Sequence, residues 1–427
     1  MLCSSLEAAR GVEDGVTEVL FSPDGKLLAT ADADGTVRLW DTATGHPVGR
    51  LAPVGSEAPG GADGMVFSPG GRVLAIADFS GTVQLWDTAT GQPVGSPAQA
   101  GSAVNDVAFS PGGQLLATAD ADDTVRLWDT ATDQPVGSPL RVGSGIQPGV
   151  TGVAFSPDGK LLATADADGT VRLWGTATGQ PVGSPLHPSS ALGLAFSPNG
   201  KLLATADNDG TVRLWDTATG QPVGSPLQVG GAVYGVAFSL NGKMLAGGSD
   251  NDTVRIWNLA TGQPVGSPLH AAGEVIAVAF SPNGKLLATA GLGGNVQVWD
   301  PATGQPVGPP LLADLTPNAS GVQNGIAFSP DGKLLASAYL DGTVQLWNPR
   351  TDQPIDPPFQ AGSALSGLAF SPNGKLLATA DADGTIRLRE ISQSADPYTV
   401  LCAEVGPPMP QNWRTYAPGA PQTRICP

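Results

Sequence analysis

Paired aspartates before a glycine are the residues of this sequence best suited to bind an ion. The segment from Asp32 to Gly35 reads DADG, and close copies of it recur along the chain. A calcium loop supplies roughly six or more oxygen ligands. Here two carboxylates precede the glycine and Thr-Val-Arg follows it. An Asp-Gly pair between two strand-like segments indicates a β-hairpin turn. We therefore interpret these acids as turn residues and predict no metal site.

The other groups that could do chemistry also lack the necessary pattern. Gly-Lys pairs such as Gly159-Lys160 continue with Leu or Met, whereas a phosphate-binding loop needs Ser or Thr after the lysine. His46, His187 and His270 lie far apart between repeated segments, and glutamate occurs only seven times. Acid–base catalysis needs a uniquely positioned group, which repeated turn aspartates do not provide. The sequence thus predicts a protein that is not an enzyme and binds no cofactor.

Net charge and hydropathy exclude further classes of binding partner. The net charge of −17 opposes binding to nucleic-acid phosphates or to an anionic membrane surface, since both require clustered Lys and Arg. The first residues lack a positive region followed by an apolar one, and no run of about 18 apolar residues occurs. We expect a cytoplasmic, monomeric protein with a protein or peptide partner, no nucleic acid and no membrane.

Three cysteines leave two interpretations open. Cys3, Cys402 and Cys426 show no CxxC spacing and lie outside the repeated segments. In a reducing compartment they would remain thiols, and after export Cys402 and Cys426 could pair.

Internal repetition dominates the chain. A Phe-Ser pair recurs nine times, at Phe21, Phe67, Phe109, Phe155, Phe196, Phe238, Phe280, Phe328 and Phe370. The steps run from 41 to 48 residues, and KLLATADADGTVRLW appears unchanged at 26–40 and 160–174. A period of this length signals a repeat architecture, in which each unit buries its core against its neighbours.

Each unit resolves into four short strands, which we name a to d. In the fifth unit, strand a covers 192–197 and a Ser-Pro-Asn-Gly turn leads to strand b at 201–207. The Asp209-Gly210 pair then reverses the chain into strand c at 211–216. A turn at Gly220 leads to the segment PVGSPL, which is rich in Pro and Gly and suits an edge strand d.

Strand c has large apolar side chains on both faces, with Val212 and Leu214 on one side and Trp215 on the other. Both faces must therefore be covered by neighbouring sheets, and a radial ring leaves only short, protected edges. Eight units place a tryptophan at the fifth position of this strand and we expect it to be structural. These residues are Trp40, Trp86, Trp128, Trp174, Trp215, Trp257, Trp299 and Trp347.

The period, the Asp-Gly turn and the Trp-Asp ending, as at Trp215-Asp216, resemble the WD-repeat β-propeller family in its bacterial type. The resemblance covers about residues 12–393 and implies an all-β fold, a single closed propeller of four-stranded blades. Nine units predict nine blades, although seven or eight are commoner in the family. The family's Gly-His pair is missing, and Ile76 and Gly247 lack the strand b hydroxyl that the other copies, such as Thr205, retain.

We therefore divide the chain into a propeller at 1–395 and a tail at 396–427. The units lie near 12–53, 62–98, 104–140, 150–186, 191–227, 233–269, 275–311, 323–359 and 365–393. In the ninth unit Arg389 replaces the tryptophan and no strand d follows. Residues 1–11 stand where a strand d would lie in the period and could close the ring, and the tail is the competing candidate.

The copies differ most in the b–c turns and at the start of strand a, which the family resemblance places on one rim. The three longest insertions, at 56–63, 143–149 and 312–323, also precede strand a. We hypothesise that this rim binds a protein or peptide, which would make the chain a scaffold or recognition propeller; neutral loop variation is the alternative. The candidate contact residues are Phe79, Tyr234, Leu292, Tyr339 and Leu340.

The tail differs in composition from the repeats. Two segments could form short helices, one starting near Pro397 and one carrying Trp413 and Tyr416 three residues apart. The Cys-Ala, Tyr-x-Pro-Gly and Cys-Pro pattern resembles the tail that follows WD repeats in bacterial STAND-class signalling ATPases. That resemblance covers about thirty residues and implies an alternative function, a sensor module separated from its ATPase domain.

Overall fold

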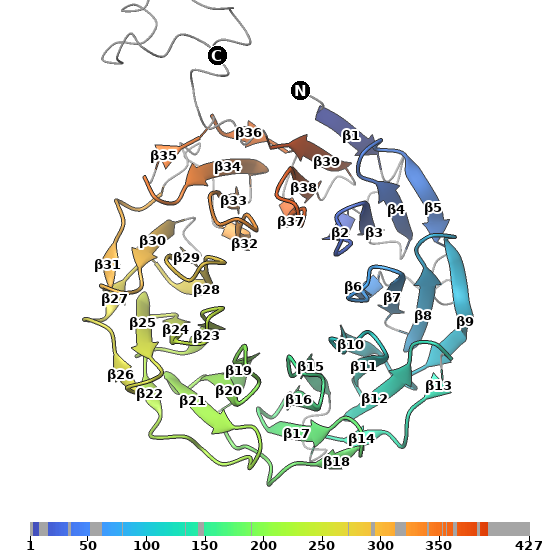
Figure 1. Ribbon diagram of the computed structural model, residues 1–427, viewed down its shortest axis with the longest axis horizontal. Coiled ribbons are helices and arrows are strands. Elements are labelled where there is room, and N and C mark those ends of the chain that lie inside the picture. Colours follow the sequence, from blue (N-terminus) through green and yellow to red (C-terminus); the bar gives the residue numbers. More distant parts are fainter. Residues whose placement is uncertain are drawn as a thin grey trace, which may run out of the picture.

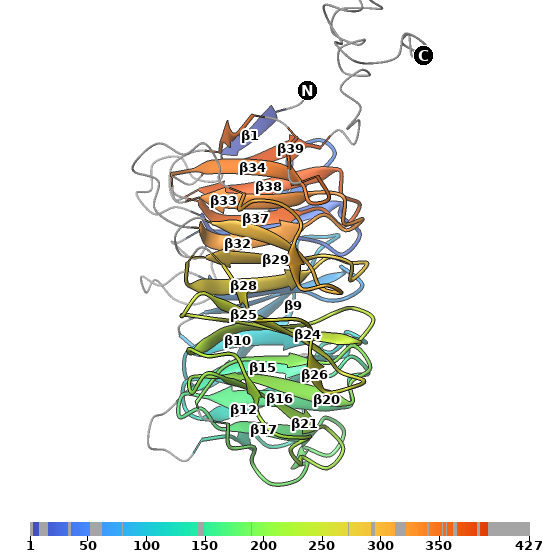
Figure 2. The ribbon, with the colours of Figure 1, turned by 90° about the vertical axis from the view of Figure 1, so that its left-hand side faces the viewer.

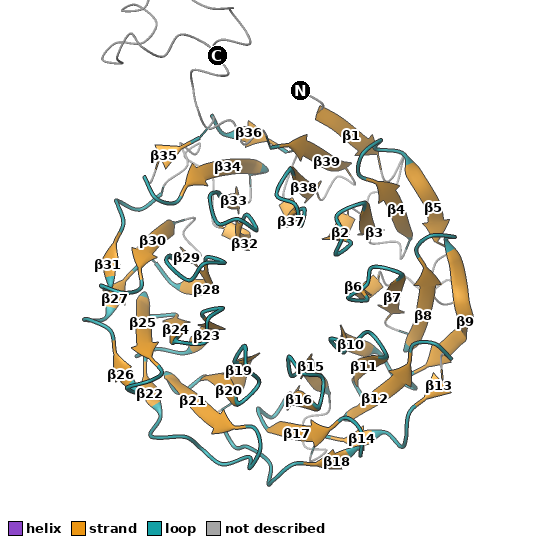
Figure 3. Cartoon of the chain, viewed as in Figure 1, coloured by secondary structure: helices purple, strands orange, loops and turns teal. Residues whose placement is uncertain are grey.

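Nine antiparallel β-sheets form a closed ring around a central axis (Figure 1). The computed structural model describes residues 3–7, 16–32, 36–51, 62–78, 80–132, 134–143, 149–188, 190–271, 273–291, 295–311, 322–339, 341–351, 353–355, 357–361, 365–381 and 385–391. Throughout these ranges the regular structure is all strand (Figure 3). The predicted all-β propeller with nine blades is therefore confirmed.

Strand a of each blade lies innermost, around the axis of the ring (Figure 1). These strands are β2 (Val16–Phe21), β6 (Ala62–Phe67), β10 (Val104–Phe109), β15 (Val150–Phe155), β19 (Ala191–Phe196), β23 (Val233–Phe238), β28 (Val275–Phe280), β32 (Val322–Phe328) and β37 (Leu365–Phe370).

Strands b and c follow outward and form the middle of each blade. The b strands are β3 (Leu27–Asp32), β7 (Val73–Asp78), β11 (Leu115–Asp120), β16 (Leu161–Asp166), β20 (Leu202–Asp207), β24 (Met244–Ser249), β29 (Leu287–Gly291), β33 (Leu335–Tyr339) and β38 (Leu376–Asp381). The c strands are β4 (Val37–Asp41), β8 (Thr82–Asp87), β12 (Thr124–Asp129), β17 (Val171–Gly175), β21 (Thr211–Asp216), β25 (Thr253–Asn258), β30 (Val296–Asp300), β34 (Thr343–Asn348) and β39 (Thr385–Glu390).

Strand d forms the outer wall and is mostly fragmented. Its pieces are β5 (Pro47–Leu51), β9 (Gln92–Gln99), β13 (Gln134–Pro135), β14 (Leu140–Arg141), β18 (Gln180–Pro181), β22 (Leu227–Gln228), β26 (Gln263–Pro264), β27 (Leu269–His270), β31 (Gln305–Pro306), β35 (Gln353–Pro354) and β36 (Phe359–Gln360). In the third blade Gly137 adopts φ +75° and Pro139 has no N–H to donate, so the ladder is interrupted between β13 and β14.

Each tryptophan of strand c fastens its blade to the preceding one. Trp215 of the fifth blade packs with Ala163, Leu173 and Leu186 of the fourth. In the same way Trp40 of the first blade packs against the ninth, so the apolar contacts run around the whole ring. All eight of these tryptophans are buried. The interface between neighbouring blades is therefore the hydrophobic core of this fold.

In six of these eight blades a hydroxyl of strand b accepts the buried indole N–H without the family's histidine. Trp215 Nε1 donates to Thr205 Oγ1 at 3.2 Å, and Trp347 Nε1 donates to Ser337 Oγ at 2.9 Å in the eighth blade. In the second blade Ile76 provides no hydroxyl, and Trp86 Nε1 is buried without a hydrogen-bond partner among the described residues. A single hydroxyl on strand b thus replaces part of the polar network that the histidine would complete.

The two ends of the chain meet in the ninth blade. Its outermost strand is β1 (Cys3–Glu7), which pairs antiparallel with β39 so that Cys3 lies opposite Arg389 and Glu7 opposite Thr385. Figure 1 shows β1 beside β39, with the N-terminal strand joined to the last sheet. The tail at 396–427 and most of the three long insertions lie outside the described residues.

Arg389 occupies the tryptophan position of the ninth blade and has its own packing. Its guanidinium carbon lies 4.0 Å from the centre of the Phe359 ring. This phenylalanine belongs to the eighth blade and takes the place of the leucine found in five other copies, Leu140, Leu186, Leu227, Leu269 and Leu311. A cation–π contact therefore replaces the apolar contact of an indole at this junction, and two sequence departures that looked independent are neighbours in space.

The ninth blade permits a matched test of the indole–hydroxyl bond. Thr205→Val should lower the free energy of unfolding by about 1–3 kcal/mol, because it leaves the buried Trp215 N–H without an acceptor. Thr379→Val in the ninth blade should be neutral or slightly stabilising, since Thr379 Oγ1 is buried with no partner among the described residues. Urea unfolding of both variants measures the difference, and equal losses would contradict the assignment.

Candidate interaction rim

The disc has two chemically different rims. Seen edge-on, its strands run across the thickness of the disc (Figure 2). The b–c turns lie beside the start of strand a, because Asn208 N donates to Ser190 O at 3.1 Å and Asp250 N donates to Ala232 O at 3.0 Å. The a–b and c–d turns meet on the opposite rim, where Thr217 N donates to Lys201 O at 3.1 Å. We name the first the bulge rim and the second the lysine rim.

A β-bulge at the start of strand a gives the bulge rim its name. In the sixth blade Val233 pairs with Ser249 and Gly235 pairs with the adjacent Gly248, so Tyr234 is an extra, unpaired residue. A bulge bends the strand and re-aims the side chain of the extra residue, and bulges are frequent beside functional sites. The same irregularity occurs in the third, fourth, fifth and seventh blades, at Asn105, Thr151, Leu192 and Ile276.

The bulge residues change character around the ring. Asn105 and Thr151 are polar, whereas the next three blades carry Leu192, Tyr234 and Ile276. Leu192 and Tyr234 are 42% and 43% exposed, and Ile276 is partly exposed. We name these three residues the apolar arc. Apolar side chains that reach solvent at the same position of three consecutive blades are of the kind that protein interfaces use as anchors.

Glycines allow the inner strands of these blades to approach closely. A Cβ atom on Gly193 would lie 3.2 Å from the carbonyl oxygen of Tyr234, and one on Gly235 would lie 3.3 Å from the backbone nitrogen of Val278. Such contacts are tighter than ordinary van der Waals packing, so a larger side chain would push the inner strands apart. The glycines therefore keep the members of the apolar arc side by side.

Two blades replace this glycine of the innermost strand with an acid. Burial raises the pKa of Glu18 to about 7, with the Met65 N–H opposing the rise and the negative charge of Asp106 adding to it. Burial also raises the pKa of Asp106, although its carboxylate accepts the N–H of Val153 at 2.9 Å and that of Val107 at 2.8 Å. Each acid thus reaches the backbone of the next blade, beside Gly64 or Gly152.

The raised pKa of Glu18 predicts a pH dependence of stability. Because the folded state holds the proton up to about pH 7 and the free carboxyl only to 4.5, the free energy of unfolding should fall as pH rises between these values. Glu18→Gln removes this loss and should stabilise the protein at pH 8 by up to about 3 kcal/mol. At pH 4.5 wild type and variant should coincide. Urea titrations at both pH values test this, and a pH-independent difference would contradict it.

The five predicted contact residues differ in where the structure places them. Tyr234 is exposed on the bulge rim, where the rim hypothesis needs it. Tyr339 was expected to be a contact residue, but this is wrong: its side chain is 0% exposed in the core between the seventh and eighth blades, and Ser337 Oγ donates to its hydroxyl at 3.1 Å. Phe79, Leu292 and Leu340 lie outside the described residues.

Sequence comparison among the copies missed Leu192 as a candidate. Leucine and alanine are common throughout the repeats, so Leu192 resembled an ordinary strand residue. The signal that could have identified it is its alignment with Tyr234 and Ile276 one unit apart. Tyr339 is buried because it ends β33, a strand b whose residues are all buried between neighbouring blades.

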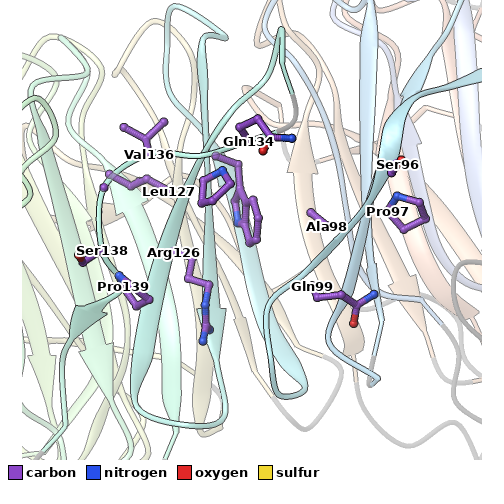
Figure 4. A pocket seen from close by; sticks show the side chains of 13 residues that line it. Ser96, Pro97, Ala98, Gln99, Arg126, Leu127, Gln134, Val136, Ser138 and Pro139 are labelled. Carbon is purple, nitrogen blue, oxygen red and sulfur yellow. The ribbon is translucent and has the colours of Figure 1, made fainter.

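The outer wall holds two hollows between blades. One of about 430 Å³ separates the second and third blades and is lined by Ser96, Gln99, Arg126 and Val136 (Figure 4). A second, of about 680 Å³, follows between the third and fourth blades. Arg126, which lines the first, is paired with Asp120 and with Asp122. Neither hollow combines a nucleophile with a base, and in the described part of the chain no cluster of His, Cys, Asp and Glu could hold a metal.

The described residues contain no helix long and apolar enough to span a bilayer.

Comparisons with known proteins agree with this architecture. The family described as the IFT122 first beta-propeller matches residues 191–396, and the family described as WD domain, G-beta repeat matches residues 4–41, 91–129 and 137–175. A segment of 41 residues is 56% identical to Protein Mut11 of Chlamydomonas reinhardtii, and it spans 10% of this chain and 11% of that protein.

Among solved structures, the computationally designed Ika8 protein is similar to this chain in fold. Its crystal structure matches with a TM-score of 0.59 at 24% identity, over 91% of this chain and 99% of that chain. The chain thus carries WD40 repeats, and they fold into a β-propeller of nine four-stranded blades.

Proposed function

We propose that this protein is a non-enzymatic scaffold or recognition propeller that binds a protein or peptide on its bulge rim. The observation that carries the proposal is the apolar arc, because Leu192, Tyr234 and Ile276 reach solvent from consecutive inner strands. Core packing does not require apolar residues at these bulges, since Asn105 and Thr151 occupy the same position in other blades. The proposal includes a monomer in the cytoplasm, with no nucleic-acid or membrane partner.

The chain offers a matched control for this site. Leu240 lies in the a–b turn of the sixth blade, on the lysine rim, and is 67% exposed. It is therefore an exposed apolar residue of the same blade as Tyr234 but on the opposite face. Nonspecific hydrophobic association would give adducts equally at both positions.

Photocrosslinking in the native cell tests the proposal. A benzophenone amino acid placed at position 234 should give a discrete adduct with a partner protein, and the same group at position 240 should not. Adducts of equal yield from both positions, or none from position 234, would refute binding at the bulge rim. Identification of the adduct by mass spectrometry names the partner.

The tail supports a second candidate function. Its Cys-Ala, Tyr-x-Pro-Gly and Cys-Pro pattern resembles the tail of STAND-class propellers, so the protein would be the sensor module of a bacterial signalling ATPase. In that case the adduct from position 234 would be a sensed ligand, and purification from the native cell would recover an ATPase with the propeller. Absence of any ATPase would leave the scaffold as the function.

A further inference from the structure

We infer that the apolar arc recognises a protein segment in which one or two large apolar side chains are flanked by Lys or Arg. This inference rests on the proposed function and specifies its partner. It follows from the shape of the bulges and from an uneven distribution of charge between the two rims.

The arc is a fixed feature of the backbone. Tyr234 is held on both sides by ladder pairs, Val233 with Ser249 and Gly235 with Gly248, and Val233 is fully buried. Leu192 is held in the same way by the pairs of Ala191 and Gly193. The backbone at these positions is therefore already ordered, so binding costs little conformational entropy there. The exposed apolar side chains that it presents favour an apolar anchor on the partner. The buried anchor would fit between two adjacent bulges.

Lysine is confined to the opposite face. Every lysine of the chain stands one or two residues before strand b, in the a–b turn of the lysine rim: Lys26, Lys160, Lys201, Lys243, Lys285, Lys333 and Lys375. The bulge rim therefore carries guanidinium groups as its main cations, and these project from strand c. An acidic partner would find its complementary charge on the lysine rim rather than around the arc.

Carboxylates outnumber cations beside the arc. In the fifth to seventh blades the b–c turns, the strand ends next to them and the start of strand a carry five acids, Asp207, Asp209, Asp250, Asp252 and Glu274. Two arginines, Arg213 and Arg255, lie on the adjoining c strands. Arg213 is already engaged, because it pairs with the buried Asp207 and reaches Asp209 at 2.8 Å. The local excess of negative charge favours cationic side chains next to the apolar anchor.

Selection from a random 12-residue peptide display library on the full chain tests this inference. Enriched peptides should combine a large apolar residue with net positive charge. Their affinity, measured by fluorescence anisotropy with synthetic copies, should fall at least tenfold for the Leu192→Ser/Tyr234→Ser double variant. It should remain within twofold for Leu240→Ser, and thermal melting of the variants should be close to wild type. Raising the salt concentration should weaken binding.

The outcomes separate this inference from the proposed function. Enriched peptides that are acidic or neutral, or that bind the double variant as tightly as wild type, would overturn the inference. If such peptides still compete with the crosslinked partner at position 234, the scaffold function stands. Failure to enrich any peptide, together with no adduct from position 234, would overturn both. Loss of binding to the double variant with intact melting supports the inference.

Discussion

Deletion of residues 1–11 should lower the free energy of unfolding of the whole protein by about 3–5 kcal/mol. The deletion removes β1, whose five residues pair with residues 385–389 of β39 and complete the ninth sheet. Each ladder hydrogen bond is worth about 1 kcal/mol, and an uncovered strand edge also exposes apolar surface. Urea unfolding monitored by tryptophan fluorescence measures the loss.

A peptide of residues 1–11 added in trans provides the control for this deletion. It should restore the stability of the truncated chain in a concentration-dependent manner, because a ligand of the folded state shifts the unfolding equilibrium by mass action. Truncation of 396–427 is the matched deletion at the other end. If that truncation destabilised the protein and loss of 1–11 did not, β1 would not be the strand that stabilises the ninth blade.

Replacement of Trp215 with alanine should cost about 4 kcal/mol. The indole fills the junction between the fourth and fifth blades, where Leu173, Leu186 and Leu203 are essentially inaccessible to solvent, so its loss leaves a cavity that the sheets cannot close. It also removes the donor to Thr205 Oγ1. Because the ring is closed, weakening of one junction should lower the cooperative unfolding transition as a whole.

Arg389→Ala is the comparison for Trp215→Ala. It stands at the equivalent position of the ninth blade, where the side chain is partly exposed and stacks on Phe359 at 4.0 Å. We expect a loss of about 1 kcal/mol, consistent with a partly solvated cation–π contact. Chemical denaturation of both variants under the same conditions gives the ratio. Similar losses at the two positions would show that burial of the indole is not what holds adjacent blades together.

The strands and turns of the repeated unit could be predicted from the sequence, because each depends on a short segment of the chain. The Asp209-Gly210 turn, the Ser-Pro-Asn-Gly turn at 197–200 and the alternation of strand c specify a hairpin wherever they occur. Their repetition nine times predicts a ring of nine blades, and the alternative of seven or eight was excluded by the nine sheets of the structure. The same reasoning overestimated the continuity of strand d, because Gly137 in the left-handed region interrupts the ladder of the predicted edge strand.

The residues of the candidate site could be predicted only in part from the sequence, as Tyr339 shows. Both Tyr234 and Tyr339 break the repeat with an aromatic residue, yet one occupies a bulge at the start of strand a and the other an inward position at the end of strand b. A residue that departs from the repeat therefore marks a local change, but its type does not tell whether its side chain is exposed or buried. Leu192 shows the converse, because its ordinary residue type hid an exposed position.

The sequence by itself determined the unit, its strands, the nine copies and the burial of the strand c tryptophans, because these depend on contacts that recur at a fixed period, whereas the closure of all nine copies into one ring came from the structure. Only the tertiary structure decided that Phe359 lies under Arg389, that β1 lies beside β39, and that Leu192, Tyr234 and Ile276 reach solvent at the bulges of consecutive inner strands. Each of these depends on which neighbours the closed ring brings together. Closure joins residues that are a whole unit or the whole chain apart, and no local propensity carries that information.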